Sequence, residues 1–90
     1  MKLPLKTRIL QYAINKGSDF TVQDVLQDLQ SEYEGEAIFT PKHVEEYVDS
    51  FLGVGFFKAA QLEFDSQDNL VIHCVITEYG RERDKYLPKE

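Results

Sequence analysis

Residues 40–77 read TPKHVEEYVDSFLGVGFFKAAQLEFDSQDNLVIHCVIT, and within this stretch the spacing of apolar residues changes from a helical to a strand period. In the first part, apolar residues recur every three or four positions, as on one face of an amphipathic helix: Val44, Tyr47, Val48, Phe51 and Leu52. Thr40 supplies an N-cap and Pro41 suits the first helical position. The pattern predicts a helix over 41–52, ended by the two glycines that follow.

From Phe56 onward the period is two, which is typical of strands. Alternate residues share one face of a first predicted strand, namely Phe56, Lys58, Ala60, Leu62 and Phe64, and of a second, namely Leu70, Ile72, Cys74 and Ile76. The polar turn DSQDN at 65–69 joins the two strands, so the sequence predicts a β-hairpin. By this alternation Phe57 and Val75 fall on the outer face of the hairpin.

Two helices are predicted before this stretch and a short one after it. Apolar residues at helical spacing indicate a helix over 5–16, ended by a glycine. Thr21, with Asp24 three residues later, predicts a capped helix over 22–33. Thr77 caps a last short helical segment, EYGRERDKYL. Its expected inward residues are Tyr79, Tyr86 and Leu87.

The order helix, helix, helix, hairpin, short helix resembles a winged helix-turn-helix domain. The predicted helices 22–33 and 41–52 resemble the helix-turn-helix pair, and residues 56–77 resemble the wing. The segment ITEYGRERDKYL is similar to the Thr-x-x-Gly-Arg segment that follows the wing in regulators of the MarR and PadR types. The resemblance implies an α+β fold in which residues 1–90 form a single winged-helix domain. It also implies an extra strand around 37–39 that pairs with the hairpin.

Length and composition agree with one globular domain. The chain has 90 residues, of which 42% are hydrophobic and 29% charged. Its single cysteine, Cys74, forbids an intramolecular disulfide, and only two histidines accompany it, so no structural zinc site is expected. The start MKLPLKTRIL carries charges where a signal peptide is apolar, and no apolar run approaches about 18 residues. We therefore expect a cytoplasmic protein with no cofactor and no membrane contact.

The net charge of -6 is unevenly distributed along the chain. Residues 1–18 carry four cations and no acid, residues 19–68 carry 12 acids and two lysines, and residues 69–90 are balanced. The acidic part therefore contains the helix and the turn that a winged-helix domain presents to DNA.

The solvent side of the predicted helix 41–52 suggests a surface that docks a protein partner. The candidate docking face consists of five carboxylates on this helix and the hairpin turn: Glu45, Glu46, Asp49, Asp65 and Asp68. An ordinary solvated face is the alternative interpretation of the same residues. The favoured function is a non-enzymatic interaction or regulatory module of the winged-helix type.

A winged-helix DNA-binding transcriptional regulator is the alternative function. Its candidate nucleic-acid contacts would be Lys42, His43, Lys58, Arg81, Arg83 and Lys85. Because phosphate binding depends on cations that release counterions, the negative charge of this half disfavours DNA as a partner.

Aromatic and apolar residues outside the core pattern predict association, either with a protein partner or as a homodimer. The candidate interface residues are Phe57, Val75, Tyr79 and Tyr86.

No pattern in the sequence predicts catalysis or a small-molecule substrate. Glu45 and Asp49 lie four residues apart, where they repel as surface charges rather than form a catalytic dyad. His73 and Cys74 are adjacent on a strand and so point to opposite faces. We expect Cys74 to be a buried, inert thiol and His73 a cross-strand surface residue, with a pH-sensitive contact as its alternative role.

Overall fold

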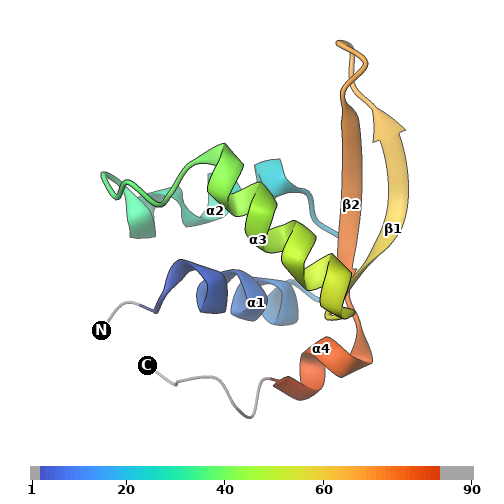
Figure 1. Ribbon diagram of the computed structural model, residues 1–90, viewed down its shortest axis with the longest axis horizontal. Coiled ribbons are helices and arrows are strands. Elements are labelled where there is room, and N and C mark those ends of the chain that lie inside the picture. Colours follow the sequence, from blue (N-terminus) through green and yellow to red (C-terminus); the bar gives the residue numbers. More distant parts are fainter. Residues whose placement is uncertain (1–2, 84–90) are drawn as a thin grey trace.

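The computed structural model describes residues 3–83, which form four helices and a two-stranded antiparallel sheet (Figure 1). The helices are α1 (Leu5–Lys16), α2 (Val22–Tyr33), α3 (Pro41–Val54) and α4 (Glu78–Glu82), and the strands are β1 (Phe57–Phe64) and β2 (Leu70–Ile76). The α+β class predicted from the sequence is confirmed. None of the helices within residues 3–83 combines the length and the apolar character that crossing a bilayer requires.

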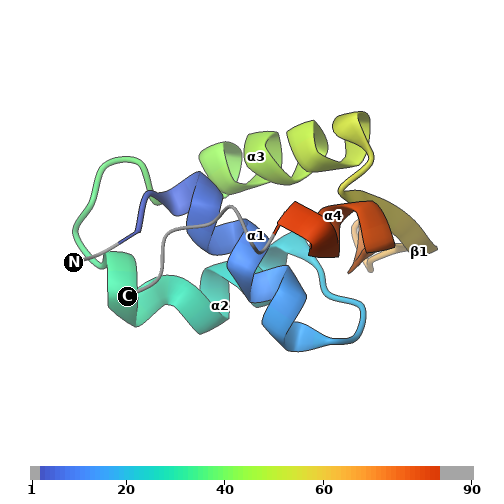
Figure 2. The same ribbon diagram turned by 90° about the horizontal axis from the view of Figure 1, so that it is seen from below.

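The first three helices pack together, with α1 below the α2–α3 pair in Figure 1 and the same group seen from below in Figure 2. The start of α2 is a complete capping box, because Thr21 Oγ1 accepts the Asp24 N–H at 3.2 Å and Asp24 Oδ2 accepts the Thr21 N–H at 3.0 Å. Helix α3 runs two residues beyond the predicted end. Gly53 is still helical, and Gly55, with φ 89°, is the left-handed residue that ends the helix.

A β-bulge decides which side chains of the hairpin face the helices. Phe57 pairs with Ile76, and Leu62 pairs with Ile72, but the register shifts between Ala59 and Gln61. One extra residue in β1 places Phe57 and Leu62 on the same face although their spacing is odd. The prediction that Phe57 lies on the outer face was therefore wrong. This candidate interface residue is 2% exposed and belongs to the core.

The linker between α1 and α2 pairs with the hairpin through one bridge. The Phe20 N–H donates to the Cys74 carbonyl at 2.8 Å, and the Cys74 N–H donates to the Phe20 carbonyl at 2.7 Å. The Phe20 ring is fully buried and meets Tyr12 and Phe57 edge to face, with centroids 5.6 and 5.3 Å away. The prediction of an extra strand around 37–39 was wrong, because this segment forms a turn. The segment that pairs with the hairpin is instead the linker between α1 and α2, which the ring contacts of Phe20 hold against β2.

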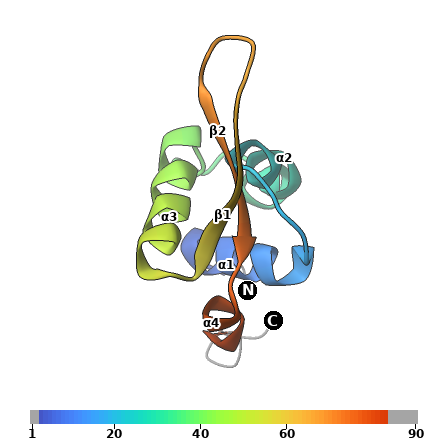
Figure 3. The ribbon, with the colours of Figure 1, turned by 90° about the vertical axis from the view of Figure 1, so that its right-hand side faces the viewer.

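The hairpin stands between α2 and α3, and its far end projects beyond the helices (Figure 3). Its near end is buried, whereas the apolar residues of its far end are exposed: Leu62 is 60%, Phe64 69% and Leu70 52% exposed.

Helix α4 closes the near end of the hairpin. Thr77 Oγ1 accepts the Gly80 N–H at 3.0 Å and donates to the Gly55 carbonyl at 2.6 Å. Gly80 is the buried residue of α4, and a methyl group there would overlap the Phe56 carbonyl oxygen. The prediction that Tyr79 points inward was wrong, because Tyr79 is 54% exposed. Tyr86 and Leu87 lie outside the described residues.

Candidate functional site

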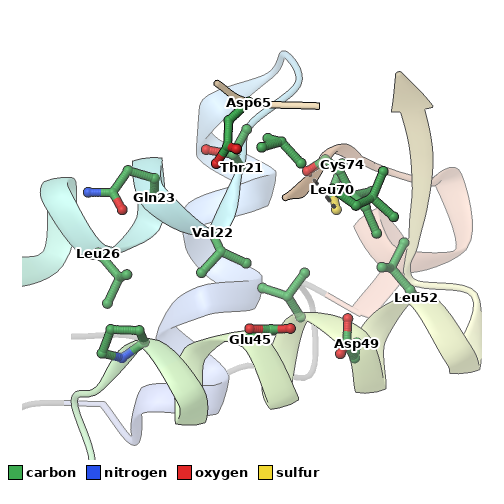
Figure 4. A pocket seen from close by; sticks show the side chains of 14 residues that line it. Thr21, Val22, Gln23, Leu26, Glu45, Asp49, Leu52, Asp65, Leu70 and Cys74 are labelled. Atoms are coloured by element: carbon green, nitrogen blue, oxygen red, sulfur yellow. Dashed lines mark hydrogen bonds between the residues drawn. The ribbon is translucent and has the colours of Figure 1, made fainter. Parts of the chain in front are cut away.

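A groove of about 440 Å³ lies between α2, α3 and the hairpin (Figure 4). Its apolar lining comes from all three elements and includes Val22, Leu26, Val48, Leu52, Leu70 and Ile72. Val22 and Leu26 lie on α2, and Leu52 belongs to the predicted apolar face of α3, but all three are only partly buried. The surrounding elements leave these side chains partly uncovered at the groove.

Three carboxylates of the predicted docking face line the groove. Glu45 and Asp49 lie one turn apart on α3, and Asp65 follows the end of β1 (Figure 4). Both α3 residues are exposed, so their carboxylates stay hydrated while their stems border apolar side chains. Glu46 and Asp68 do not line the groove. The structure therefore brings together three of the five predicted residues.

Asp65 also holds the hairpin turn. Its Oδ1 accepts the Gln67 N–H at 2.8 Å and the Asn69 N–H at 2.9 Å. These backbone hydrogen bonds lower the pKa of Asp65 below its usual value, and the bond from Asn69 has the larger effect. The Asp65 carboxylate therefore remains ionised. Asp68 adopts φ 62° in the same turn and donates its N–H to the Asp65 carbonyl at 3.0 Å. The turn thus fixes a negative charge at the edge of the groove.

The two candidate nucleic-acid contacts on α3 differ in their freedom to contact a ligand. Lys42 is exposed in the first turn. His43 is partly buried, and its Nδ1 is hydrogen-bonded to the N-cap hydroxyl of Thr40 at 2.8 Å. His43 therefore supports the helix start.

The remaining candidate nucleic-acid contacts lie elsewhere. Lys58 pairs with Val75 on the outer face of the hairpin. Arg81 belongs to α4, and Arg83 follows it and lies beside Val54 at the C-terminal end of α3. Lys42 lies at the opposite end of α3, about 18 Å from Val54 at a rise of about 1.5 Å per residue. Lys85 lies outside the described residues. The structure does not gather these cations into one surface.

His73 joins the hairpin to the α1–α2 linker. Its Nδ1 lies 3.0 Å from Asp19 Oδ2, and its Nε2 lies 2.5 Å from Glu63 Oε1. The hydrogen bond to Glu63, reinforced by Asp19, raises the pKa of His73 above its usual value. No local pattern marks Asp19 as a partner of His73, because 54 residues separate the two.

Cys74, the single cysteine of the chain, also lines the groove. Cys74 is 1% exposed, and burial raises its pKa to about 11, so the prediction that this thiol is buried is confirmed. Residues 3–83 contain no group of three His, Cys, Asp or Glu side chains placed to hold a metal ion. Comparisons of the chain with models of protein families, with curated proteins and with solved structures found no match.

Proposed function

We propose that this α+β domain is a winged helix-turn-helix module that binds proteins, and that its groove receives a basic, partly apolar segment of a partner protein. The order of three helices, a hairpin and a short helix supports the winged-helix assignment. The bridge between Phe20 and Cys74 gives further support, because it ties the linker between the first two helices to the sheet. The projecting hairpin beside α3 corresponds to the wing.

The observation that carries the proposed function is the pairing of an apolar floor with a rim of carboxylates. Leu26, Leu52 and Ile72 offer apolar surface whose removal from water favours binding, at about 25 cal/mol per Å². Glu45 and Asp49 add a negative field that selects Lys and Arg in the bound segment and speeds its approach. A volume of about 440 Å³ lies in the range of ordinary ligand pockets, so it admits a few side chains of a peptide.

The second candidate function, a DNA-binding regulator, is favoured by the exposed α3 beside the projecting hairpin. In that arrangement α3 would enter the major groove, where bases are read mostly by Arg, Lys, Asn and Gln. The outward residues of α3 include Glu45, Glu46 and Asp49 against the single cation Lys42. This surface repels phosphates, so protein binding ranks first.

A random peptide library displayed on phage, selected against the full chain, tests the proposed function. We expect the selected peptides to be enriched in Lys and Arg alternating with apolar residues. Synthetic copies of two such peptides are then titrated by fluorescence anisotropy. Glu45→Lys and Asp49→Lys should each weaken binding about fivefold, since each removes one exposed attraction and adds one repulsion, about 1 kcal/mol together.

The matched control is Glu46→Lys, which makes the same charge change on the same helix outside the groove. Its binding should stay within about twofold of the wild type. An equal loss with Glu46→Lys, or a selected pool without basic residues, would contradict the groove as the binding site. Fluorescence anisotropy with a DNA duplex of about 20 base pairs and mixed sequence, at about 50 mM salt, tests the second function. Saturable binding with a steep salt dependence would rank DNA binding above protein binding.

A further inference from the structure

The large apolar side chains exposed on residues 3–83 fall on two separate surfaces. Three lie at the end of the hairpin (residues 62–70, the hairpin tip), and two, Val54 and Tyr79, lie where α3 meets α4. Val54 is 58% exposed and Tyr79 54%. Exposed apolar groups that gather in this way are typical of interaction surfaces.

The second surface is a hollow of about 330 Å³, here named the α3–α4 hollow, lined by Lys6, Ser50, Phe51, Val54, Phe56, Tyr79 and Arg83. Its aromatic rings contact one another: Phe51 stacks on Phe56 at 5.7 Å, and Phe56 meets Tyr79 at 5.1 Å. The lining residues described by the structure include two cations and no carboxylate. Lys6 Nζ lies 5.8 Å from the Phe51 ring centre, and the Arg83 guanidinium lies 5.7 Å from that of Phe56.

The hairpin tip has the opposite shape and charge. It projects from the body of the molecule (Figure 3), and Phe64, 69% exposed, is its largest apolar side chain. Two acids of the turn, Asp65 and Asp68, accompany the apolar residues, while Glu63 is paired with His73. The sequence has neither Lys nor Arg between Lys58 and Arg81. The tip is therefore convex, apolar and anionic, whereas the α3–α4 hollow is concave, aromatic and cationic.

We propose that the hairpin tip of one copy of this chain docks into the α3–α4 hollow of a second copy. Phe64 and Leu62 would cover the exposed Val54 and Tyr79, and the acids of the tip would face Lys6 and Arg83. The contact joins two different surfaces of the same chain, so each single contact uses the tip of one copy and the hollow of the other. It would bury both surfaces of exposed large apolar side chains in one interface. It would also bring the carboxylates of the tip close to the cations of the hollow. Asp65 and Leu70 belong both to the tip and to the lining of the groove, but the contact does not rest on the function proposed for the groove.

Sedimentation velocity of the full chain between about 5 and 500 µM tests this contact. The wild type should associate with rising concentration. Phe64→Ser, which removes the apolar tip, and Tyr79→Ser, which opens the hollow, should each weaken association at least tenfold. Both residues are more than half exposed, so circular dichroism should show the same fold for both variants.

Mixing the two variants distinguishes a defined contact from general stickiness. The Tyr79→Ser chain keeps an intact tip and the Phe64→Ser chain keeps an intact hollow, so an equal mixture should regain association, limited to complexes of two chains. A mixture that sediments as monomers at concentrations where the wild type associates would overturn the proposal.

The charge component has its own matched pair. Lys6→Glu should weaken association, because it would place a carboxylate opposite the carboxylates of the tip, which repel it. Lys16→Glu makes the same change on the same helix, beside Tyr12 and outside the hollow, and should have little effect. Monomeric wild-type protein throughout the range, or equal effects of the two substitutions, would overturn the proposal. Glu45→Lys in the groove should leave association intact, which separates this result from failure of the proposed function.

Discussion

The base and the tip of the hairpin are built from the same two strands and similar apolar residues, yet their environments are opposite. At the base, Phe57, Cys74 and Ile76 are 2%, 1% and 6% exposed. At the tip, Leu62, Phe64 and Leu70 are more than half exposed. The difference arises because Phe20 pairs with the base of the hairpin, whereas the tip projects beyond the helices (Figure 3), so strand pattern alone does not decide burial.

The largest expected effect comes from emptying the base. Phe57→Ala should lower the free energy of unfolding by about 3–5 kcal/mol, because it removes a buried ring and leaves a cavity beside Phe20 and Phe51. Urea denaturation followed by far-ultraviolet circular dichroism measures this loss. A loss below about 1 kcal/mol would mean that the base is not part of the core.

A smaller effect is expected from crowding the base. Gly80→Ala should destabilise by about 1–3 kcal/mol, because the added methyl group overlaps the Phe56 carbonyl oxygen and the Ile76 side chain. Gly53→Ala is the matched control, since it lies in a helix with open space around it and should be neutral or stabilise by up to about 1 kcal/mol. Thermal unfolding of both variants measures the two changes in stability. Equal destabilisation by Gly80→Ala and Gly53→Ala would contradict the close packing of α4.

The boundary between base and tip should respond to pH through His73. Folding raises the pKa of His73, so the folded state binds this proton more tightly than the unfolded state. The stabilisation is complete below the unfolded pKa of about 6.5 and is lost as pH rises through the folded pKa.

Urea denaturation of wild type and His73→Gln at pH 5.5, 7 and 8.5 measures this dependence. The stability advantage of the wild type should be greatest at pH 5.5 and should decrease steadily towards pH 8.5. An advantage that is constant or grows with pH would show that the contacts with Asp19 and Glu63 do not hold the imidazolium.

The smallest effect on stability is expected at the tip. Phe64→Ser should change the free energy of unfolding by no more than about 0.5 kcal/mol when measured at 5 µM, because the ring is already 69% exposed. Its effect should instead appear in association at high concentration. A loss above about 1.5 kcal/mol at 5 µM would show that the tip packs within its own chain.

The helices could be predicted closely from the sequence, because their caps and apolar stripes are local signals. The predicted helices 5–16 and 22–33 coincide with α1 and α2, and α3 differs only by continuing to Val54. The two strands and the turn at 65–69 were also predicted. The faces of β1 were not, because the bulge near Ala60 contains no glycine or other turn residue that marks it.

The candidate site was predictable in its charge and not in its shape. The sequence indicates that Glu45, Asp49 and Asp65 belong to the acidic part of the chain, and the structure brings these three to one groove. The floor of the groove consists of residues whose spacing predicts ordinary core. That Leu26 and Leu52 are only partly buried depends on how the hairpin and the helices pack together, which no local pattern encodes.

By itself, the sequence determined where the helices and strands lie, which part of the chain is acidic, and that Cys74 would be buried. These properties follow from residues a few positions apart, whose periodicity, capping and charge act locally. Only the tertiary structure decided that Phe20 pairs with β2, that Phe57 is core while Phe64 is surface, and that His73 meets Asp19. These outcomes depend on contacts between residues far apart in the chain, and on which apolar surfaces the packed elements are long enough to cover.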